Sequence, residues 1–209
     1  MFKSLYDSPV IATLVPCVVA AVVLVLAQRK KPVARTYATV FSIAIAADAY
    51  LNGPWTPVKS GTAWATAVGV FFVIFGDFRY FVVLERSLHN RLELVRAAAW
   101  AFVVPVTAQI IRWSIPRIEH DERSTFLLYE ILFFALAVFI QAVRVPRAKE
   151  RGMARRATAF VLVQYGTWIA ADIGLMTVGS DAFYLVRIVA NLLYYVAFVP
   201  YMTKLLEAR

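Results

Sequence analysis

The sequence predicts an all-α polytopic membrane protein with seven transmembrane helices, its N-terminus outside and its C-terminus cytoplasmic. Three observations carry this prediction. Hydrophobic residues make up 61% of the 209 residues and charged residues only 17%, whereas a soluble chain averages about half apolar and a quarter charged. The apolar residues fall in runs long enough to cross a bilayer. The basic residues gather in the short connectors between those runs, as membrane orientation requires.

Seven apolar segments follow one another along the chain, and no hydrophilic block is long enough to form an extramembrane domain, so residues 1–209 form a single transmembrane domain. Strands of a membrane barrel are about ten residues long and alternate in polarity, so these longer runs favour helices. The first run ends in Arg29-Lys30-Lys31 instead of at a small-residue cleavage site, which makes it a helix and not a signal peptide. The predicted helices are 8–28, 33–52, 63–85, 94–113, 126–145, 157–178 and 182–203.

The connectors set the predicted orientation, because lysine and arginine are enriched in cytoplasmic loops. One side of the predicted bundle carries Arg29, Lys30, Lys31, Arg35, Arg86, Arg91, Arg96, Arg144, Arg147, Lys149, Arg151, Arg155, Arg156, Lys204 and Arg209. The other side carries only Lys3, Lys59, Arg112, Arg117 and Arg123, and its loop 112–123 also holds Glu119, Asp121 and Glu122. The richly basic side is therefore the cytoplasmic one.

Two outer connectors have their own signals. The segment Asn52-Gly53-Pro54-Trp55-Thr56-Pro57 predicts a turn with an interfacial tryptophan, since Gly and Pro end the helix and indole favours the headgroup level. The connector Gly179-Ser180-Asp181 is so short that the helices on its two sides must be antiparallel neighbours.

Several short sequence segments recur along the chain, and one interpretation of them is an internal duplication. Ile45–Asp48 in the second helix matches Ile169–Asp172 in the sixth, and Phe71–Phe75 parallels Tyr194–Phe198 one helix further on. Helices 1–3 would then repeat as helices 5–7 in the same orientation, although short Ala, Phe and Val words also recur by chance. This three-plus-one-plus-three plan resembles, in architecture, the SWEET sugar transporters and related PQ-loop proteins. The resemblance implies a substrate site between the repeats, near the middle of the membrane.

Charged residues near the outer ends of the last two helices predict a polar pocket. Asp172 and Arg187 lie at similar depths on neighbouring antiparallel helices, so we expect an ion pair. Aromatic and polar residues share their helix faces, and two further acids lie near the outer ends of other helices. The alternative is a structural ion pair with water-exposed interfacial acids. The predicted pocket residues are Asp48, Glu130, Tyr165, Trp168, Asp172, Arg187, Asn191 and Tyr194.

Asp77 lies close to the middle of the third predicted helix, where an unpaired carboxylate is costly. It joins the predicted substrate-binding set as a proton site, a catalytic acid or a carboxylic acid held neutral by burial. The neighbouring Gly76 would allow close approach of another helix. Arg79 is expected to extend its side chain towards the inner surface.

Two functions follow from these residues. The first is binding or transport of a small polar solute through a pocket lined by polar and aromatic side chains. The second follows from Gly76-Asp77, Asp172, Arg187 and Tyr194-Tyr195-Val196-Ala197, which are similar to the motif pattern of lysoplasmalogenase-type membrane hydrolases. This similarity implies an acid–base pair of Asp77 and Asp172 that acts on a lysolipid vinyl ether.

A seven-helix receptor is a third interpretation. Retinal needs a lysine in the middle of the last helix, and the nearest one here is Lys204 at its cytoplasmic end, so the receptor would lack a Schiff base. The lone Cys17 and the two histidines in connectors predict no metal and no cofactor. The expected partners are the lipid bilayer, a small-molecule or lipid ligand and a second copy of the chain, with no nucleic acid. The expected location is the bacterial cytoplasmic membrane.

Overall fold

The computed structural model of the protein describes residues 1–115 and 122–208, and this part of the chain contains helices and no strand. Within it, six helical stretches are long and apolar enough to cross a membrane: Phe2–Ala27, Ala63–His89, Leu94–Ser114, Arg123–Arg147, Arg151–Thr177 and Phe183–Glu207. Several expose an apolar face, as Val18, Val22 and Val25 do on the first, which a helix in water would bury. The all-α prediction is confirmed, and these helices indicate an integral membrane protein.

The predicted segment 33–52 is the helix α3, Pro32–Leu51, which begins with a proline at its first position, where the missing N–H costs nothing. Its 20 residues span roughly 30 Å, the thickness of a hydrocarbon core. It is not among the six apolar stretches, because Arg35, Asp48 and several hydroxyl side chains make it more polar.

The other helices lie within a few residues of their predicted bounds. They are α1 Phe2–Tyr6, α2 Val15–Ala27, α4 Ala63–His89, α5 Leu94–Ser114, α7 Glu122–Phe139, α8 Arg151–Thr177, α9 Phe183–Leu192 and α10 Phe198–Glu207. Among the starts of the apolar stretches, two differ most: the first begins at Phe2, six residues before the predicted 8, and α8 begins six residues before the predicted 157. Hydropathy detects only the apolar part of a helix, whereas the arginine-rich start of α8 also favours helix.

Within the described ranges, three π-helical turns interrupt the long helices, at Val10–Leu14 before α2, at Ile140–Arg144 after α7 and at Leu193–Ala197 between α9 and α10. A proline follows each of them closely: Pro16, Pro146 and Pro200. A proline ring clashes with the carbonyl four residues earlier and donates no hydrogen bond to it. In all three cases that carbonyl lies inside the π turn. The wider turn accommodates Pro16 and Pro200, after which the helix continues, whereas after Ile140–Arg144 it ends in the 3-10 turn Val145–Arg147.

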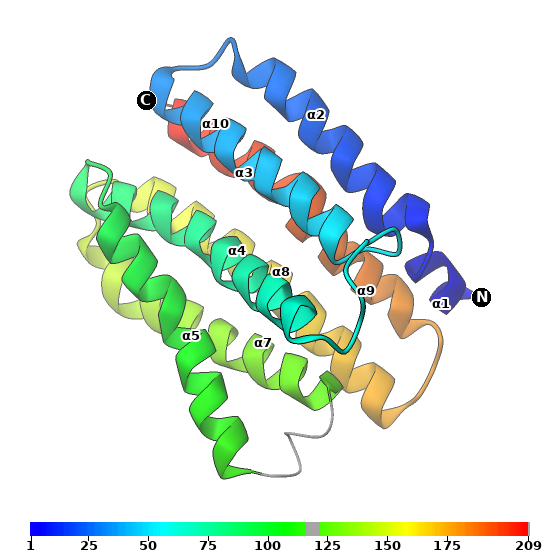
Figure 1. The fold of residues 1–209 in the computed structure, drawn as a ribbon. Helices are drawn as coiled ribbons and strands as arrows, with labels where there is room; N and C mark the ends of the chain where they lie inside the picture. The colour runs from blue at the N-terminus through cyan, green and yellow to red at the C-terminus, as the bar shows by residue number, and fades with distance from the viewer. Residues whose placement is uncertain (116–121, 209) are drawn as a thin grey trace. The chain divides into compact units, whose positions relative to one another are not determined.

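The chain forms two compact units, and the divisions fall inside α4, after Gly76, and inside α9, after Ala190. The first unit comprises Met1–Gly76 and Asn191–Arg209. Within it α3 packs against both α2 and α10 (Figure 1). Lys30 forms an ion pair of 2.7 Å with Glu207, which fastens the end of α10 to the connector between α2 and α3.

The second unit comprises Asp77–Ala190. In it α7 packs against α8 and also against α5 (Figure 1). Tyr80, Phe81 and Phe133 form its buried aromatic core. The loop charges Arg117, Glu119 and Asp121, which entered the orientation argument, lie outside the described residues.

Candidate functional site

Asp77 lies at the centre of the 27-residue helix α4 and its side chain is 3% exposed. Both of its carboxylate oxygens accept a hydrogen bond from a tyrosine. Tyr165 on α8 donates to Oδ1 at 2.7 Å, and Tyr129 on α7 donates to Oδ2. Three helices of the second unit thus meet at one carboxyl group. Such an arrangement satisfies a buried acid by hydrogen bonds without a direct cation contact.

Aromatic rings surround the two tyrosines. Phe133 stacks on Tyr165 with the ring centroids 4.3 Å apart, and Tyr165 meets Trp168 edge to face at 5.3 Å. Tyr129 and Phe133 are four residues apart on α7, so they lie on one helix face. These contacts hold both hydroxyl groups in place against Asp77.

Gly76 is in close contact with Tyr194, as expected for a residue without a side chain. A Cβ atom at this position would collide with the hydroxyl group of Tyr194 in the π turn before α10, within the first unit. Tyr194 also lies edge to face with Tyr195, at 4.7 Å. A small residue at position 76 therefore lets this aromatic pair approach the backbone of α4.

The predicted ion pair between Asp172 and Arg187 is present. Asp172, on α8, is fully buried, and Nη1 of Arg187, on α9, donates to its Oδ1. The two helices come close because Gly174 leaves room for the ring of Phe183 and Gly179 turns the chain with a positive φ of 67°. The short connector thus brings Asp172 and Arg187 close enough to pair.

Two carboxylate oxygens near this pair lack a hydrogen-bond partner among the described residues: Oδ2 of Asp172 and Oε2 of Glu130. Both are buried. The positive charges of Arg187 and Arg123 attract the carboxylate of Glu130. Buried acceptors without donors are rare in proteins, so these two oxygens are available to a donor that is not part of the described chain.

The remaining predicted pocket residues belong to the first unit. The side chain of Asp48 is buried and accepts a hydrogen bond of 2.7 Å from Asn52, one turn further along the chain. Asn191 lines a hollow of the same unit, and Tyr194 contacts Gly76. The nine predicted residues therefore divide into Asp77, Glu130, Tyr165, Trp168, Asp172 and Arg187 in the second unit and Asp48, Asn191 and Tyr194 in the first.

The expectation for Arg79 is wrong. Its side chain is 2% exposed and does not extend to a surface. Its charge acts on Asp77, two residues earlier in the same helix. A cation near a buried acid offsets part of the cost of holding both groups inside the protein, which explains why the arginine stays buried.

The sequence analysis did not single out Tyr129 or a further buried acid, Glu85. The sequence could have indicated Tyr129 as a site residue, because it precedes Glu130 and lies one turn from Phe133. Glu85 lies at the end of the predicted helix 63–85, next to Arg86, and therefore looks like an interfacial charge. In the structure it is fully buried, because α4 continues to His89.

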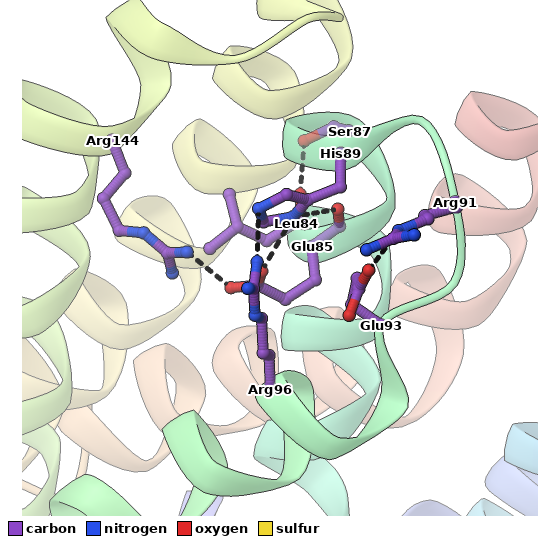
Figure 2. Close-up of polar contacts among 8 residues, drawn as sticks. All are labelled: Leu84, Glu85, Ser87, His89, Arg91, Glu93, Arg96 and Arg144. Carbon is purple, nitrogen blue, oxygen red and sulfur yellow. Dashed lines mark hydrogen bonds and ion pairs between the residues drawn. The ribbon is translucent and has the colours of Figure 1, made fainter.

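Figure 2 shows how Glu85 is held. Arg144, at the end of the π turn after α7, pairs with its Oε1 at 2.6 Å, and Nδ1 of His89 lies 3.2 Å from its Oε2. Arg96 donates to Nε2 of His89 at 2.8 Å. A guanidinium group only donates, so Nε2 accepts and the imidazole proton lies on Nδ1, facing Glu85.

Two further contacts complete this Glu85 cluster. The guanidinium group of Arg144 lies over the ring of Trp100, on α5, 4.6 Å from its centroid. The backbone N–H of Glu150 donates to the carbonyl of Ser87 at 3.0 Å. The end of α4 is thereby joined to α5, to the π turn after α7 and to the connector that precedes α8.

Among residues 1–115 and 122–208, no three His, Cys, Asp or Glu side chains lie together as a metal site would require. Comparison of the chain with protein-family models, with curated proteins and with solved structures finds no match.

Proposed function

We propose that this integral membrane protein binds and transports a small polar solute, and that Asp77 is the proton-exchanging acid of the process. The observation that carries the proposal is the carboxyl group of Asp77, buried at the centre of a membrane-length helix and held by Tyr129 and Tyr165. Ionisable residues inside a membrane mark substrate or proton pathways. The two tyrosine donors, together with the charge of Arg79, stabilise the carboxylate that remains when the acid loses its proton.

The two unpartnered buried oxygens of Asp172 and Glu130 support a solute with hydrogen-bond donors. A hydroxyl or amine group would satisfy them, whereas an apolar ligand would leave them without partners. The ring of Trp168 lies beside Tyr165 and supplies the apolar wall that small-molecule sites usually have.

The proposed topology has α3 as a seventh transmembrane helix, an outside N-terminus and a cytoplasmic C-terminus. The basic connectors support it through the bias of lysine and arginine towards cytoplasmic loops. A parallel repeat of the first three and last three helices, as in SWEET and PQ-loop transporters, belongs to the same proposal. It is supported by the match of Ile45–Asp48 with Ile169–Asp172.

Hydrolysis of a lysolipid, as the lysoplasmalogenase resemblance implies, is the second candidate. It is favoured by one observation: Asp77 and Asp172 are both buried acids of the second unit, and Oδ2 of Asp172 has no hydrogen-bond partner among the described residues. Arg187 stabilises the ionised form of Asp172. In a hydrolase, Asp172 would therefore be the base and Asp77 the acid.

Solute-driven proton movement in proteoliposomes tests the leading proposal. The purified chain is reconstituted with a pH-sensitive dye in the lumen, and a sugar, a polyol and a neutral amino acid are added in turn. We expect at least one class to change the lumenal pH. Asp77→Asn should abolish the signal and still fold, Asp77→Glu should keep a fraction, and Tyr165→Phe should weaken the response roughly tenfold, as loss of a hydrogen bond to a charged group does.

Tyr37→Phe is the matched control, because Tyr37 is a buried tyrosine of α3 in the first unit. It should leave the signal unchanged. A folded Asp77→Asn protein with full transport would overturn the role of Asp77. Release of an aldehyde from a lysoplasmenyl lipid, with no proton movement for any solute, would replace transport by hydrolysis.

A further inference from the structure

A hollow of about 460 Å³ opens in the first unit, within the range of small-molecule sites. Its walls come from α1 and the π turn before α2, from the end of α3, and from the joint between α9 and α10. Its polar lining consists of Tyr6, Asp7, Asn52, Asn191 and Tyr195. The site is separate from Asp77, and the inference does not depend on the proposed transport.

Two of the three π turns face this hollow. Ala12, in the first turn, and Val196, in the last, are both lining residues. Each lies four residues before a proline, Pro16 and Pro200. Proline has no N–H, so neither carbonyl can accept the hydrogen bond that a regular α-helix would provide four residues later. π turns are frequent at functional sites.

The charge of the lining favours a cation. None of the described residues that line the hollow is basic, and Asp7 contributes a carboxylate. This carboxylate already pairs at 2.6 Å with the ammonium group of Lys3, which is exposed and does not line the hollow. Tyr6 and Tyr195 add aromatic rings, whose faces attract cations. An anion would have to compete with the carboxylate of Asp7 for the ammonium group of Lys3.

The ligand is organic rather than a metal ion. Ile11, Leu192 and Val196 give the hollow apolar surface, which an alkylammonium group covers and a hydrated metal ion does not. We propose that this hollow binds a small organic ammonium ion, with Asp7 as its counter-ion and the side-chain amide dipoles of Asn52 and Asn191 around it. The ammonium group is either that of a free solute or that of a lipid headgroup.

Equilibrium dialysis of labelled choline against the purified full-length chain tests this inference. Its neutral isostere 3,3-dimethylbutan-1-ol, which has carbon in place of the cationic nitrogen, is the matched competitor. We expect saturable choline binding that the isostere displaces poorly. Asp7→Asn should weaken binding about threefold or more, because the counter-ion is lost, and Lys3→Gln should strengthen it about threefold, because a competing ammonium group is removed.

Glu93→Gln is the control, since Glu93 is also a carboxylate paired with a nearby basic residue, Arg91, but lies outside the hollow. It should leave choline binding unchanged. Equal displacement by the isostere, absence of saturable binding, or no change in both the Asp7 and the Lys3 variants would each overturn the proposal.

Nanodiscs separate the two sources of the ammonium group. In phosphatidylglycerol discs both sources predict binding of free choline. If phosphatidylcholine discs suppress that binding, the occupant is a lipid headgroup. If they leave it unchanged, the occupant is a free solute. Either result supports an ammonium site.

Discussion

At the scale of single residues, the chain places several acids inside a membrane-length helix bundle and gives them different partners. Asp77 is held by hydroxyl groups, Asp172 by a guanidinium group and Asp48 by an amide. A hydroxyl group stabilises a carboxylate less than a cation does, so the acid between the tyrosines is the one best suited to gain and lose a proton.

The ion pair of Asp172 and Arg187 gives a test at this scale. Asp172→Asn or Arg187→Gln should each destabilise the protein by roughly 3–5 kcal/mol, because each removes one charge of a buried ion pair. The double variant should lose less than the sum. Unfolding of the purified protein in mixed micelles measures these free energies in a double-mutant cycle. Strictly additive losses would mean that the two residues do not interact.

The sequence predicted this pair from spacing, because the Gly179 turn fixes which helices are neighbours. It did not predict the partners of Asp77. Spacing along a helix identifies the residues that share a face, as Tyr165 and Trp168 do, but the choice of facing helix depends on packing across the bundle. Tyr129 is 52 residues from Asp77 in the chain, and no local pattern joins the two.

At the scale of elements, the helix bounds were predictable and the π turns were not. A proline within an apolar run signals a kink or a wider turn, but Pro105 lies inside α5 without a π turn, so the residue alone does not decide the geometry. The burial of Glu85 also needed the structure, since it follows from the extra turn by which α4 exceeds its apolar segment.

The Glu85 cluster predicts strong coupling between α4 and the π turn after α7. Arg144→Gln should destabilise the protein by roughly 3–5 kcal/mol, because it leaves a fully buried carboxylate without its cation. Glu85→Gln should do the same to Arg144. Thermal unfolding of the detergent-solubilised variants measures the loss.

Arg91→Gln provides the control for this measurement. Arg91 also pairs with a glutamate, but its side chain is 75% exposed, and exposed pairs contribute little to stability. It should leave the unfolding temperature nearly unchanged. A similarly small effect of Arg144→Gln would show that the cluster does not join these elements.

At the scale of the whole molecule, the basic connectors predict which segments lie on each side of the membrane. Lys59→Cys and Arg151→Cys, each in a Cys17→Ala background, place single thiols at an exposed position of the connector after α3 and at the exposed first residue of α8. A membrane-impermeant thiol reagent added to intact cells should label residue 59 at once and residue 151 only after permeabilisation. Labelling of both from the same side would contradict the proposed topology, and the Cys17→Ala protein alone should stay unlabelled.

The division of the first unit between the two ends of the chain has a consequence for synthesis. α3 has no segment as apolar as those of the six apolar stretches, and it packs against α2 and α10. α10 begins at Phe198, so a ribosome makes it only after all of residues 77–190. During that time the face of α3 that later packs against α10, and Asp48 on the same helix, can be covered only by α2, by lipid or by the insertion machinery. The nascent chain must therefore hold α3 beside α2 in the membrane until the whole second unit has been inserted.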